Sequence, residues 1–183
     1  MLKKTLFLDR DGVVNIDHGY LYKPEQFEFI DGVFEACKLF QQAGYNIVII
    51  TNQSGIGRGY YTEQDFHNLT SWMVAEFKKQ GIQILDVFFC PHHPVKAQAP
   101  YLKDCNCRKP APGMLLNAID KHQLDPKSSI MVGDKGSDMK AAIHAGLGHK
   151  FLVTSGQTLS EQDVLLADHV YPSLPALAIN FLA

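Results

Sequence analysis

The chain has 183 residues, of which 46% are hydrophobic and 20% are charged, and its formal net charge is -2. This length predicts one domain, residues 1–183, with a substantial core, while the charge argues against a nucleic-acid partner and no apolar run could cross a membrane. We therefore expect a cytoplasmic monomer whose four cysteines are thiols or metal ligands, not disulfides.

Short apolar runs alternate with helical patterns along the chain. The runs that predict strands are 5–8, 45–50, 84–89, 129–132, 150–153 and 169–171. The patterns that predict helices are 31–43, 62–80, 112–122 and 137–145. Such alternation is typical of βαβ units, so we predict an α/β fold with a Rossmann-like parallel sheet and helices on both faces.

The predicted helix at 62–80 has clear local signals. Thr62 can cap its start. Apolar side chains then recur at helical spacing, at Phe66, Leu69, Met73 and Phe77. We expect this stripe, and Cys37 on the apolar face of the preceding helix, to lie in the core.

Polar side chains follow the predicted strands where each strand ends. Asp9 and Asp11 leave the first strand on the same face, because they are two residues apart. The stretch 51–59 follows the second strand, 134–138 follows the fourth, and Lys109 precedes a helix. Parallel strands end at one edge of a sheet, so we expect these groups to meet. Taken alone, each is also typical of a polar turn or a helix cap.

Phosphoryl transfer requires this combination of groups. Mg²⁺ takes oxygen ligands, which Asp9, Asp134 and a backbone carbonyl near Asp11 can supply. The Thr51 hydroxyl and the Lys109 ammonium group can stabilise the phosphoryl oxygens. One carboxylate can attack phosphorus while a second transfers protons. The pattern therefore predicts a phosphatase.

These motifs resemble those of the haloacid dehalogenase superfamily of phosphatases. The matching stretches are Asp9-x-Asp11-Gly-Val, Thr51-Asn52, Lys109 and Gly133-Asp134-x-x-x-Asp138. The similarity extends to the sugar-bisphosphate phosphatases of the histidinol-phosphatase-like branch, through segments 9–15, 17–20, 29–33, 51–59, 90–94, 105–114 and 133–135. It implies the fold of that superfamily, without a large cap domain.

The resemblance also implies a role for each site residue. Asp9 is the implied nucleophile and Asp11 the general acid and base, while Thr51 and Lys109 stabilise the phosphoryl group. Mg²⁺ is held by Asp9, by the carbonyl of Asp11 and by Asp134. Substrate contacts are implied for Asp17, His18, Gly19, Tyr20, Asn52, Gln53, Ser54, Arg108 and Lys135.

A polar, proline-rich segment carries two close pairs of metal-binding side chains, Cys90 with His92 and Cys105 with Cys107. Three thiols and one imidazole suit tetrahedral Zn²⁺ without an open position, so such a metal would be structural and would fix the loop 90–107. The pairs are closer in sequence than in familiar zinc motifs, and unrelated thiols in a loop are the alternative. The resemblance implies a zinc loop, and it favours His92 over His93.

We thus expect a Mg²⁺-dependent phosphatase of a sugar bisphosphate that acts through an aspartyl-phosphate, in nucleotide-activated sugar synthesis. A histidinol-phosphate phosphatase is the main alternative because it shares the zinc loop, although segments 17–20 and 52–59 argue against it. A non-catalytic, zinc-stabilised binding module would not need the Mg²⁺ motifs. A nucleic-acid 3′-phosphatase would need a basic excess that the chain lacks.

Overall fold

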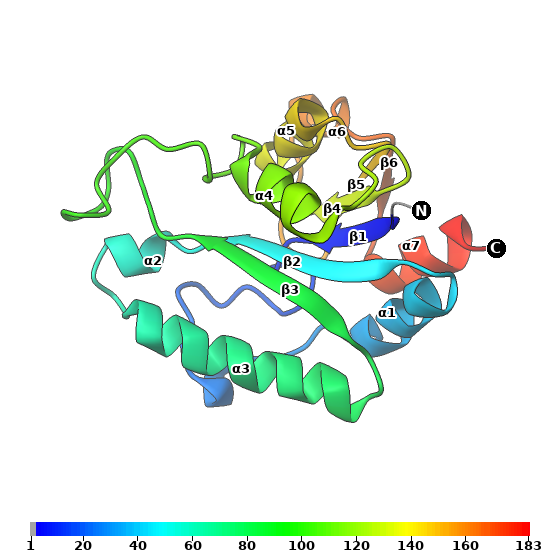
Figure 1. Cartoon of the computed structure of the whole chain (residues 1–183), viewed down its shortest axis with the longest axis horizontal. Coiled ribbons are helices and arrows are strands. Elements are labelled where there is room, and N and C mark those ends of the chain that lie inside the picture. Colours follow the sequence, from blue (N-terminus) through cyan, green and yellow to red (C-terminus); the bar gives the residue numbers. More distant parts are fainter. Residues whose placement is uncertain (1–2) are drawn as a thin grey trace.

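A six-stranded, fully parallel sheet forms the centre of the fold (Figure 1). The structure is a computed structural model and describes residues 3–183. Its strands are β1 (Thr5–Leu8), β2 (Asn46–Asn52), β3 (Ile84–Cys90), β4 (Ile130–Gly133), β5 (His149–Val153) and β6 (His169–Tyr171). Their order is β3-β2-β1-β4-β5-β6. The predicted parallel sheet is confirmed, and each predicted strand is present to within two residues at either end.

Helices cover both faces of the sheet. They are α1 (Val33–Gln42), α2 (Ser54–Gly57), α3 (Glu63–Lys79), α4 (Gly113–His122), α5 (Gly136–Ala145), α6 (Glu161–Val164) and α7 (Leu174–Phe181), with a 3-10 turn, η1 (Pro24–Gln26). Helices α1, α3 and α7 lie on one side, and α4 and α5 lie on the other with α6 beside α5 (Figure 1). The four predicted helices are confirmed, whereas α2, α6 and α7 were not predicted. Among residues 3–183, no helix has both the length and the apolar character that a membrane crossing needs.

The local signals in α3 act as expected. The Thr62 hydroxyl accepts a hydrogen bond from the Asp65 backbone N–H at 3.1 Å, and the Asp65 carboxylate accepts one from the Thr62 N–H at 2.8 Å. This reciprocal pair is a capping box. The predicted stripe is buried at Phe66, Leu69, Met73 and Phe77. Cys37 is also buried, which raises the pKa of its thiol to about 12.

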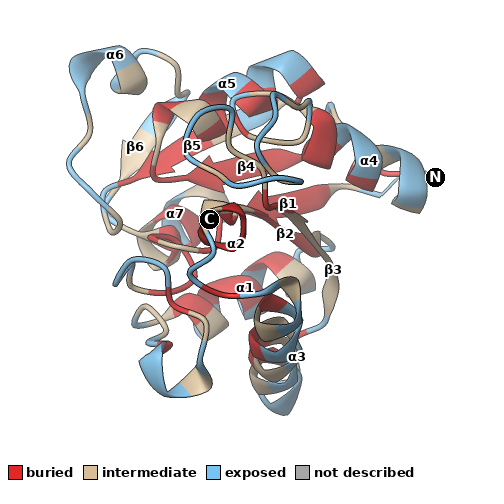
Figure 2. Cartoon of the chain, turned by 90° about the vertical axis from the view of Figure 1, so that its left-hand side faces the viewer, coloured by how far each residue is buried: buried red, intermediate tan, exposed pale blue. Residues whose placement is uncertain are grey.

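The central strands β1, β2 and β4 are buried on both faces, as Figure 2 shows for the centre of the sheet. In β1, Leu6 and Leu8 pack with α1, α3 and α7, whereas Phe7 between them packs with α4 and α5. All three side chains have no exposed surface. This two-sided burial explains why the strand sequences are continuous apolar runs without alternation.

The strand order determines where the site lies. After β1, strands β2 and β3 are added on one side of it, whereas β4, β5 and β6 are added on the other side. Strand β1 lies between β2 and β4, with Leu8 paired to Ile49 on one side and to Val132 on the other. The Asp9 N–H donates to the Val132 carbonyl oxygen at 3.0 Å, so pairing continues to the end of β1. The carboxyl ends of β1 and β4 therefore open a crevice at the point where open α/β sheets bind ligands.

Candidate active site

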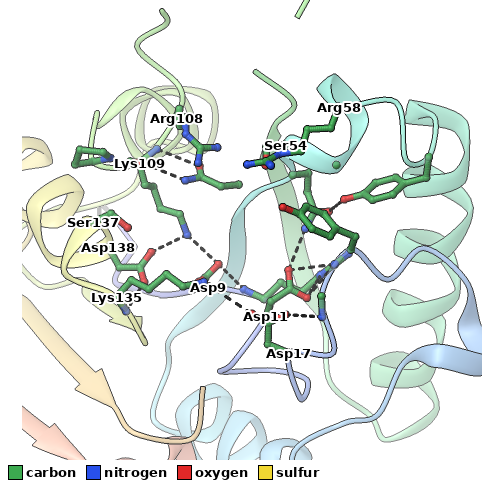
Figure 3. Close-up of a pocket in the computed structure, with 18 residues that line it drawn as sticks. Asp9, Asp11, Asp17, Ser54, Arg58, Arg108, Lys109, Lys135, Ser137 and Asp138 are labelled. Carbon is green, nitrogen blue, oxygen red and sulfur yellow. Dashed lines mark hydrogen bonds and ion pairs between the residues drawn. The ribbon is translucent and has the colours of Figure 1, made fainter. Parts of the chain in front are cut away.

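A cavity of about 600 Å³ opens at the carboxyl ends of the central strands (Figure 3). The predicted site residues in its wall are Asp9, Asp11, Asp17, Gly19, Tyr20, Asn52, Gln53, Ser54, Arg108, Lys109 and Lys135. Thr51 and Asp134 are almost completely buried and are not part of this wall. His18 lines a neighbouring hollow, where its Nε2 lies 3.0 Å from Glu28 Oε2. The structure thus brings together most of the predicted site.

Lys109 is the buried cation of the site. Its Nζ lies 2.8 Å from Asp9 Oδ1, 2.7 Å from Asp138 Oδ1 and 3.0 Å from the carbonyl oxygen of Ile50 (Figure 3). Burial alone would lower the pKa of this ammonium group, but Asp138 and Asp9 raise the pKa above its ordinary value. Lys109 therefore stays charged and holds one oxygen of Asp9 in place.

The Asp9 carboxylate is held through one of its oxygens. Oδ1 accepts a hydrogen bond from the Arg10 backbone N–H at 2.8 Å in addition to the contact from Lys109. Both hydrogen bonds that the described residues donate to this carboxylate end on Oδ1. The other oxygen, Oδ2, is therefore the one that the site offers to a cation or to an incoming group.

Asp134 is a buried carboxylate without a hydrogen-bond donor. Neither of its side-chain oxygens has a partner among the described residues, and the residue is 1% exposed. Burial, and then the charge of Asp9, raise the pKa of Asp134 to about 8, and burial likewise raises the pKa of Asp138 to about 6. Ligand oxygens of these three acids lie within 4.8 Å of one another. The Asp138 carboxylate already forms an ion pair with Lys109. The carboxylates of Asp9 and Asp134 therefore remain as ligands for a hard cation that prefers oxygen, such as Mg²⁺.

Two glycines make room for the Asp134 carboxylate. A Cβ atom on Gly12 would lie 2.4 Å from Asp134 Oδ2, and one on Gly156 would lie 2.1 Å from it. Gly12 also has a φ of +87°, which favours glycine. The Ser155 hydroxyl donates to the Gly12 carbonyl oxygen at 2.8 Å, and Gln157 Nε2 donates to the Asp134 carbonyl oxygen at 3.2 Å. No local sequence motif marks this loop after β5, so it was not among the predicted parts of the site.

The Asp11 carboxylate is surrounded by hydrogen-bond donors. Arg10 Nη2 lies 3.0 and 3.1 Å from its two oxygens, Asn15 Nδ2 lies 3.0 Å from Oδ1, and Gln53 Nε2 lies 3.1 Å from Oδ2. Burial alone would raise the pKa of Asp11, but the Arg10 charge and the Asn15 hydrogen bond lower it below its ordinary value. Arg10, which is 2% exposed, and Asn15 were not among the predicted site residues.

Asn52 holds the backbone of Lys109. Its Nδ2 donates to the Lys109 carbonyl oxygen at 3.1 Å, and its Oδ1 accepts from the Lys109 N–H at 3.1 Å. One side-chain amide thus replaces a pair of backbone hydrogen bonds. The contact ties the end of β2 to the segment before α4, which sets where the Lys109 side chain begins.

Four possible metal ligands come together in the loop 90–107 and form what we call the cysteine cluster: Cys90, His92, Cys105 and Cys107. Their ligand atoms lie within 4.8 Å of one another. His92 Nδ1 lies 3.3 Å from Cys107 Sγ, and Cys105 Sγ lies 3.6 Å from Cys90 Sγ and 3.4 Å from Cys107 Sγ. A tetrahedral site with Zn–S bonds of about 2.3 Å has edges of about 3.7 Å, so these separations are close to those of a zinc site. Cys107 Sγ and Cys90 Sγ, at 2.7 Å, lie closer together than such an edge. His93 lies outside the cluster, because its Nδ1 accepts hydrogen bonds from the Val95 and Lys96 N–H groups.

Comparisons with known proteins agree with this geometry. The sequence model of the HAD-hydrolase-like family matches residues 106–177. The D-glycero-β-D-manno-heptose-1,7-bisphosphate 7-phosphatase of Vibrio cholerae is 47% identical over 174 residues, which are 95% of this chain and 94% of that protein. The Escherichia coli K12 protein of that name is 44% identical over 173 residues, 94% of this chain and 91% of that protein. The crystal structure of D,D-heptose 1,7-bisphosphate phosphatase from B. bronchiseptica, complexed with magnesium and phosphate, matches with a TM-score of 0.83 at 30% identity, over 98% of both chains.

The Asp134→Asn variant should be more stable than the wild type when no Mg²⁺ is added. The pKa of Asp134 is raised to about 8 in the folded protein, whereas an unfolded Asp has a pKa of about 3.9. Wild-type stability should therefore fall as the pH rises between these values, while that of the variant should not. We expect a gain of roughly 1–3 kcal/mol in unfolding free energy at pH 8 and none below about pH 4.

Thermal unfolding between about pH 4 and pH 9 measures this difference. The matched control is Asp120→Asn, which removes an exposed carboxylate from α4. A wild type that is as stable as Asp134→Asn at pH 8 would contradict the assignment of Asp134 as a carboxylate that burial destabilises.

Proposed function

The chain belongs to the family of D-glycero-β-D-manno-heptose-1,7-bisphosphate 7-phosphatases of the haloacid dehalogenase superfamily, and we infer its reaction from this premise. It is a Mg²⁺-dependent phosphatase that removes the 7-phosphate of D-glycero-D-manno-heptose 1,7-bisphosphate. The reaction belongs to the synthesis of nucleotide-activated heptose for lipopolysaccharide core or S-layer glycans. The structural observation that best supports this function is the buried carboxylate of Asp134. It lies next to Asp9, and neither of its oxygens accepts a hydrogen bond from a described residue.

The cation site is formed by two chain segments, the one that follows β1 and the one that follows β4. Asp9, Asp134 and the backbone carbonyl of Asp11 would hold Mg²⁺, and the unpartnered oxygens of Asp134 support this proposal. When bound, the cation offsets the repulsion between these carboxylates and the phosphate of the substrate. Lys109 supplies a second, permanent positive charge on the opposite oxygen of Asp9.

Asp9 acts as the nucleophile. Its free oxygen forms a bond to the phosphorus atom of the 7-phosphate, and the bond from phosphorus to the sugar oxygen breaks with its electron pair on the leaving oxygen. The Thr51 hydroxyl and Lys109 stabilise the charge on the transferred group. The result is an aspartyl-phosphate at Asp9 and a released sugar.

Asp11 transfers the protons in both halves of the reaction. It donates a proton to the leaving sugar oxygen, and it then removes one from the water that attacks the aspartyl-phosphate and releases inorganic phosphate. Its lowered pKa favours the carboxylate that the second half requires. The negative charge of a bound phosphate favours the protonated form that the first half requires.

The remaining part of the substrate binds at the cavity rim. Arg108 lines the cavity, and its planar fork suits the oxyanion of a second phosphate. Lys135 Nζ lies 3.9 Å from Asp17 Oδ2, so this pair can close over a sugar. Gly19 and Tyr20 with Ser54 frame the opening, and His18 would reach the substrate only through a movement of its loop. We take the β-anomer as the substrate, since the names of the Vibrio cholerae and Escherichia coli relatives specify it.

The cysteine cluster binds a structural Zn²⁺. All four ligands come from the protein, so no position is left for a substrate or a reacting water. The metal would fix the loop 90–107 and thereby the backbone that leads into Arg108 and Lys109. The site residues surround one edge of a single sheet, which supports a protein that acts as a single-domain monomer. The four free cysteines agree with a location in the reducing cytoplasm.

The purified protein should prefer the β-anomer of heptose 1,7-bisphosphate. We expect kcat/KM for it to exceed the value for histidinol phosphate by at least about tenfold, because only a bisphosphate uses both Arg108 and Lys135. We expect a similar preference over the α-anomer, because the configuration at C1 decides whether the 1-phosphate points toward Arg108. Phosphate release with each substrate and excess Mg²⁺ measures the preference. A clear preference for histidinol phosphate would overturn the substrate assignment and support the alternative function.

Replacement of Asp9 by Asn should abolish turnover, because an amide cannot form the aspartyl-phosphate. We expect kcat to fall by about 10³-fold or more, with the fold intact. Hydroxylamine added during turnover should modify Asp9 in the wild type, which peptide mass analysis can detect. Asp120→Asn is the control with unchanged turnover, and an active Asp9→Asn enzyme would disprove covalent catalysis by this residue.

Protein purified without chelator should contain one zinc per chain. Cys107→Ser should lose most of this zinc, and the loop 90–107 should become sensitive to proteases. Cys37→Ser is the matched control, because Cys37 is a buried thiol outside the cluster and its loss should leave the zinc content unchanged. Elemental analysis measures both variants. A metal-free wild type would count against the zinc site.

A further inference from the structure

The buried side chain of Gln53 lies between two residues to which the proposed function gives catalytic roles, Asp11 and Thr51. It directly follows β2 and is 3% exposed. Its Nε2 donates to Asp11 Oδ2 at 3.1 Å and to Thr51 Oγ1 at 2.9 Å. Its Oε1 accepts a hydrogen bond from the Tyr61 hydroxyl. One side-chain amide therefore contacts both the Asp11 carboxylate, to which the proposed function gives the proton transfers, and the Thr51 hydroxyl, to which it gives the stabilisation of the phosphoryl group.

The orientation of this amide is determined by its neighbours on both sides. If the amide were reversed, Oε1 would face the Asp11 carboxylate, and two acceptors would repel each other. On the other side, burial raises the pKa of Tyr61, so its hydroxyl keeps the proton that it donates to Oε1. The charge of Asp11 and the proton of Tyr61 thus favour the same orientation.

The Tyr61 ring is itself held in place by the fold. It is 6% exposed and stacks on the Tyr22 ring, with a centroid distance of 5.5 Å. A Cβ atom on Gly55 would lie 2.3 Å from Cε1 of this ring, so only glycine at that position lets the ring approach Gln53. This packing gives a physical reason for the first glycine of the stretch 51–59.

We propose that Gln53, oriented by the Tyr61 hydroxyl, is a positioning residue that sets the Asp11 carboxylate and the Thr51 hydroxyl relative to each other. The proposal rests on the roles of Asp11 and Thr51 in the proposed function. Because Thr51 Oγ1 accepts a hydrogen bond from Gln53, the proton of its hydroxyl is directed away from the amide and is free for a phosphoryl oxygen. The same amide group restrains the Asp11 oxygen.

This role differs from the substrate contact that the sequence resemblance implied for Gln53. The amide nitrogen has two hydrogens, and two acceptors within the protein use them, at Asp11 and Thr51. The amide oxygen is used by Tyr61. No donor remains for the substrate, so the loss of Gln53 should affect the rate of the chemical steps rather than the binding of the sugar.

Steady-state kinetics of three variants test the proposal. Gln53→Leu keeps the side-chain size and removes all three side-chain hydrogen bonds, and we expect kcat to fall between about tenfold and a hundredfold while KM changes less than about twofold. Tyr61→Phe removes only the hydroxyl and should lower kcat by about threefold, with KM again unchanged. Tyr22→Phe is the matched control, because it keeps the stacked ring without touching Gln53, and its kinetics should equal those of the wild type.

A second measurement does not depend on turnover. The side-chain amide of Gln53, assigned in the wild type by triple-resonance NMR, should exchange its hydrogens slowly in the wild type and in Tyr22→Phe. It should exchange faster in Tyr61→Phe, and this comparison remains valid if Gln53→Leu folds poorly.

The outcomes separate this inference from the proposed function. An inactive wild type would overturn the proposed function itself. With an active wild type, a raised KM at unchanged kcat in Gln53→Leu would make Gln53 a substrate contact and would overturn only the inference. Equal amide exchange in Tyr61→Phe and Tyr22→Phe would overturn the orienting role of Tyr61.

Discussion

One buried ammonium group joins the ends of the central strands. Lys109 Nζ contacts Asp9 after β1, Asp138 in α5 and the carbonyl oxygen of Ile50 in β2. Two carboxylates so close together and away from water would repel each other, and the ammonium group offsets this repulsion. Removal of Lys109 would leave two buried carboxylates without a counter-charge, which costs roughly 3–5 kcal/mol. The geometry of the site is therefore tied to its charge balance.

Lys109 reaches this position because the long segment between β3 and α4 is held at several points. Asn52 binds the Lys109 backbone through two hydrogen bonds. Gly57 in α2 approaches the segment closely, since a Cβ atom there would lie 2.6 Å from the Pro91 carbonyl oxygen. The Gln98 N–H donates to the Gly57 carbonyl oxygen at 2.7 Å. Each ordered residue of a loop loses conformational entropy, so these contacts, with the cysteine cluster, stabilise a segment that has no helix or strand of its own.

The features that sequence reasoning predicted are those that depend on neighbours along the chain. The β1 and β2 strands were predicted from continuous apolar runs, and Asp9 was placed at the sheet edge because it directly follows such a run. Helix α2 was not predicted, because Gly55 and Gly57 each disfavour a helix by about 1 kcal/mol. They are required by close contacts with Tyr61 and Pro91.

The partners of the site residues were the part that could not be predicted. Gln53 bonds to Asp11, 42 positions away, and Asn52 bonds to Lys109, 57 positions away. A motif indicates that a polar residue ends a strand, but not whether it faces the ligand or another side chain. The sequence predicts the edge of the sheet at which chemistry occurs, and the packing decides which side chains act on others.

The charge of the site also explains why it needs both a cation and an anion. Asp9, Asp134 and Asp138 carry more negative charge than the buried Lys109 can offset, and Lys135 at the rim is 41% exposed. A dianionic phosphate would meet repulsion from Asp134, whereas a cation alone would leave Lys109 and the rim cations without an anionic partner. Binding of either group reduces the unfavourable charge that opposes the other. We therefore propose that the buried carboxylate of Asp134 couples the binding of the cation to that of the phosphate, so that a neutral residue at this position would remove the coupling.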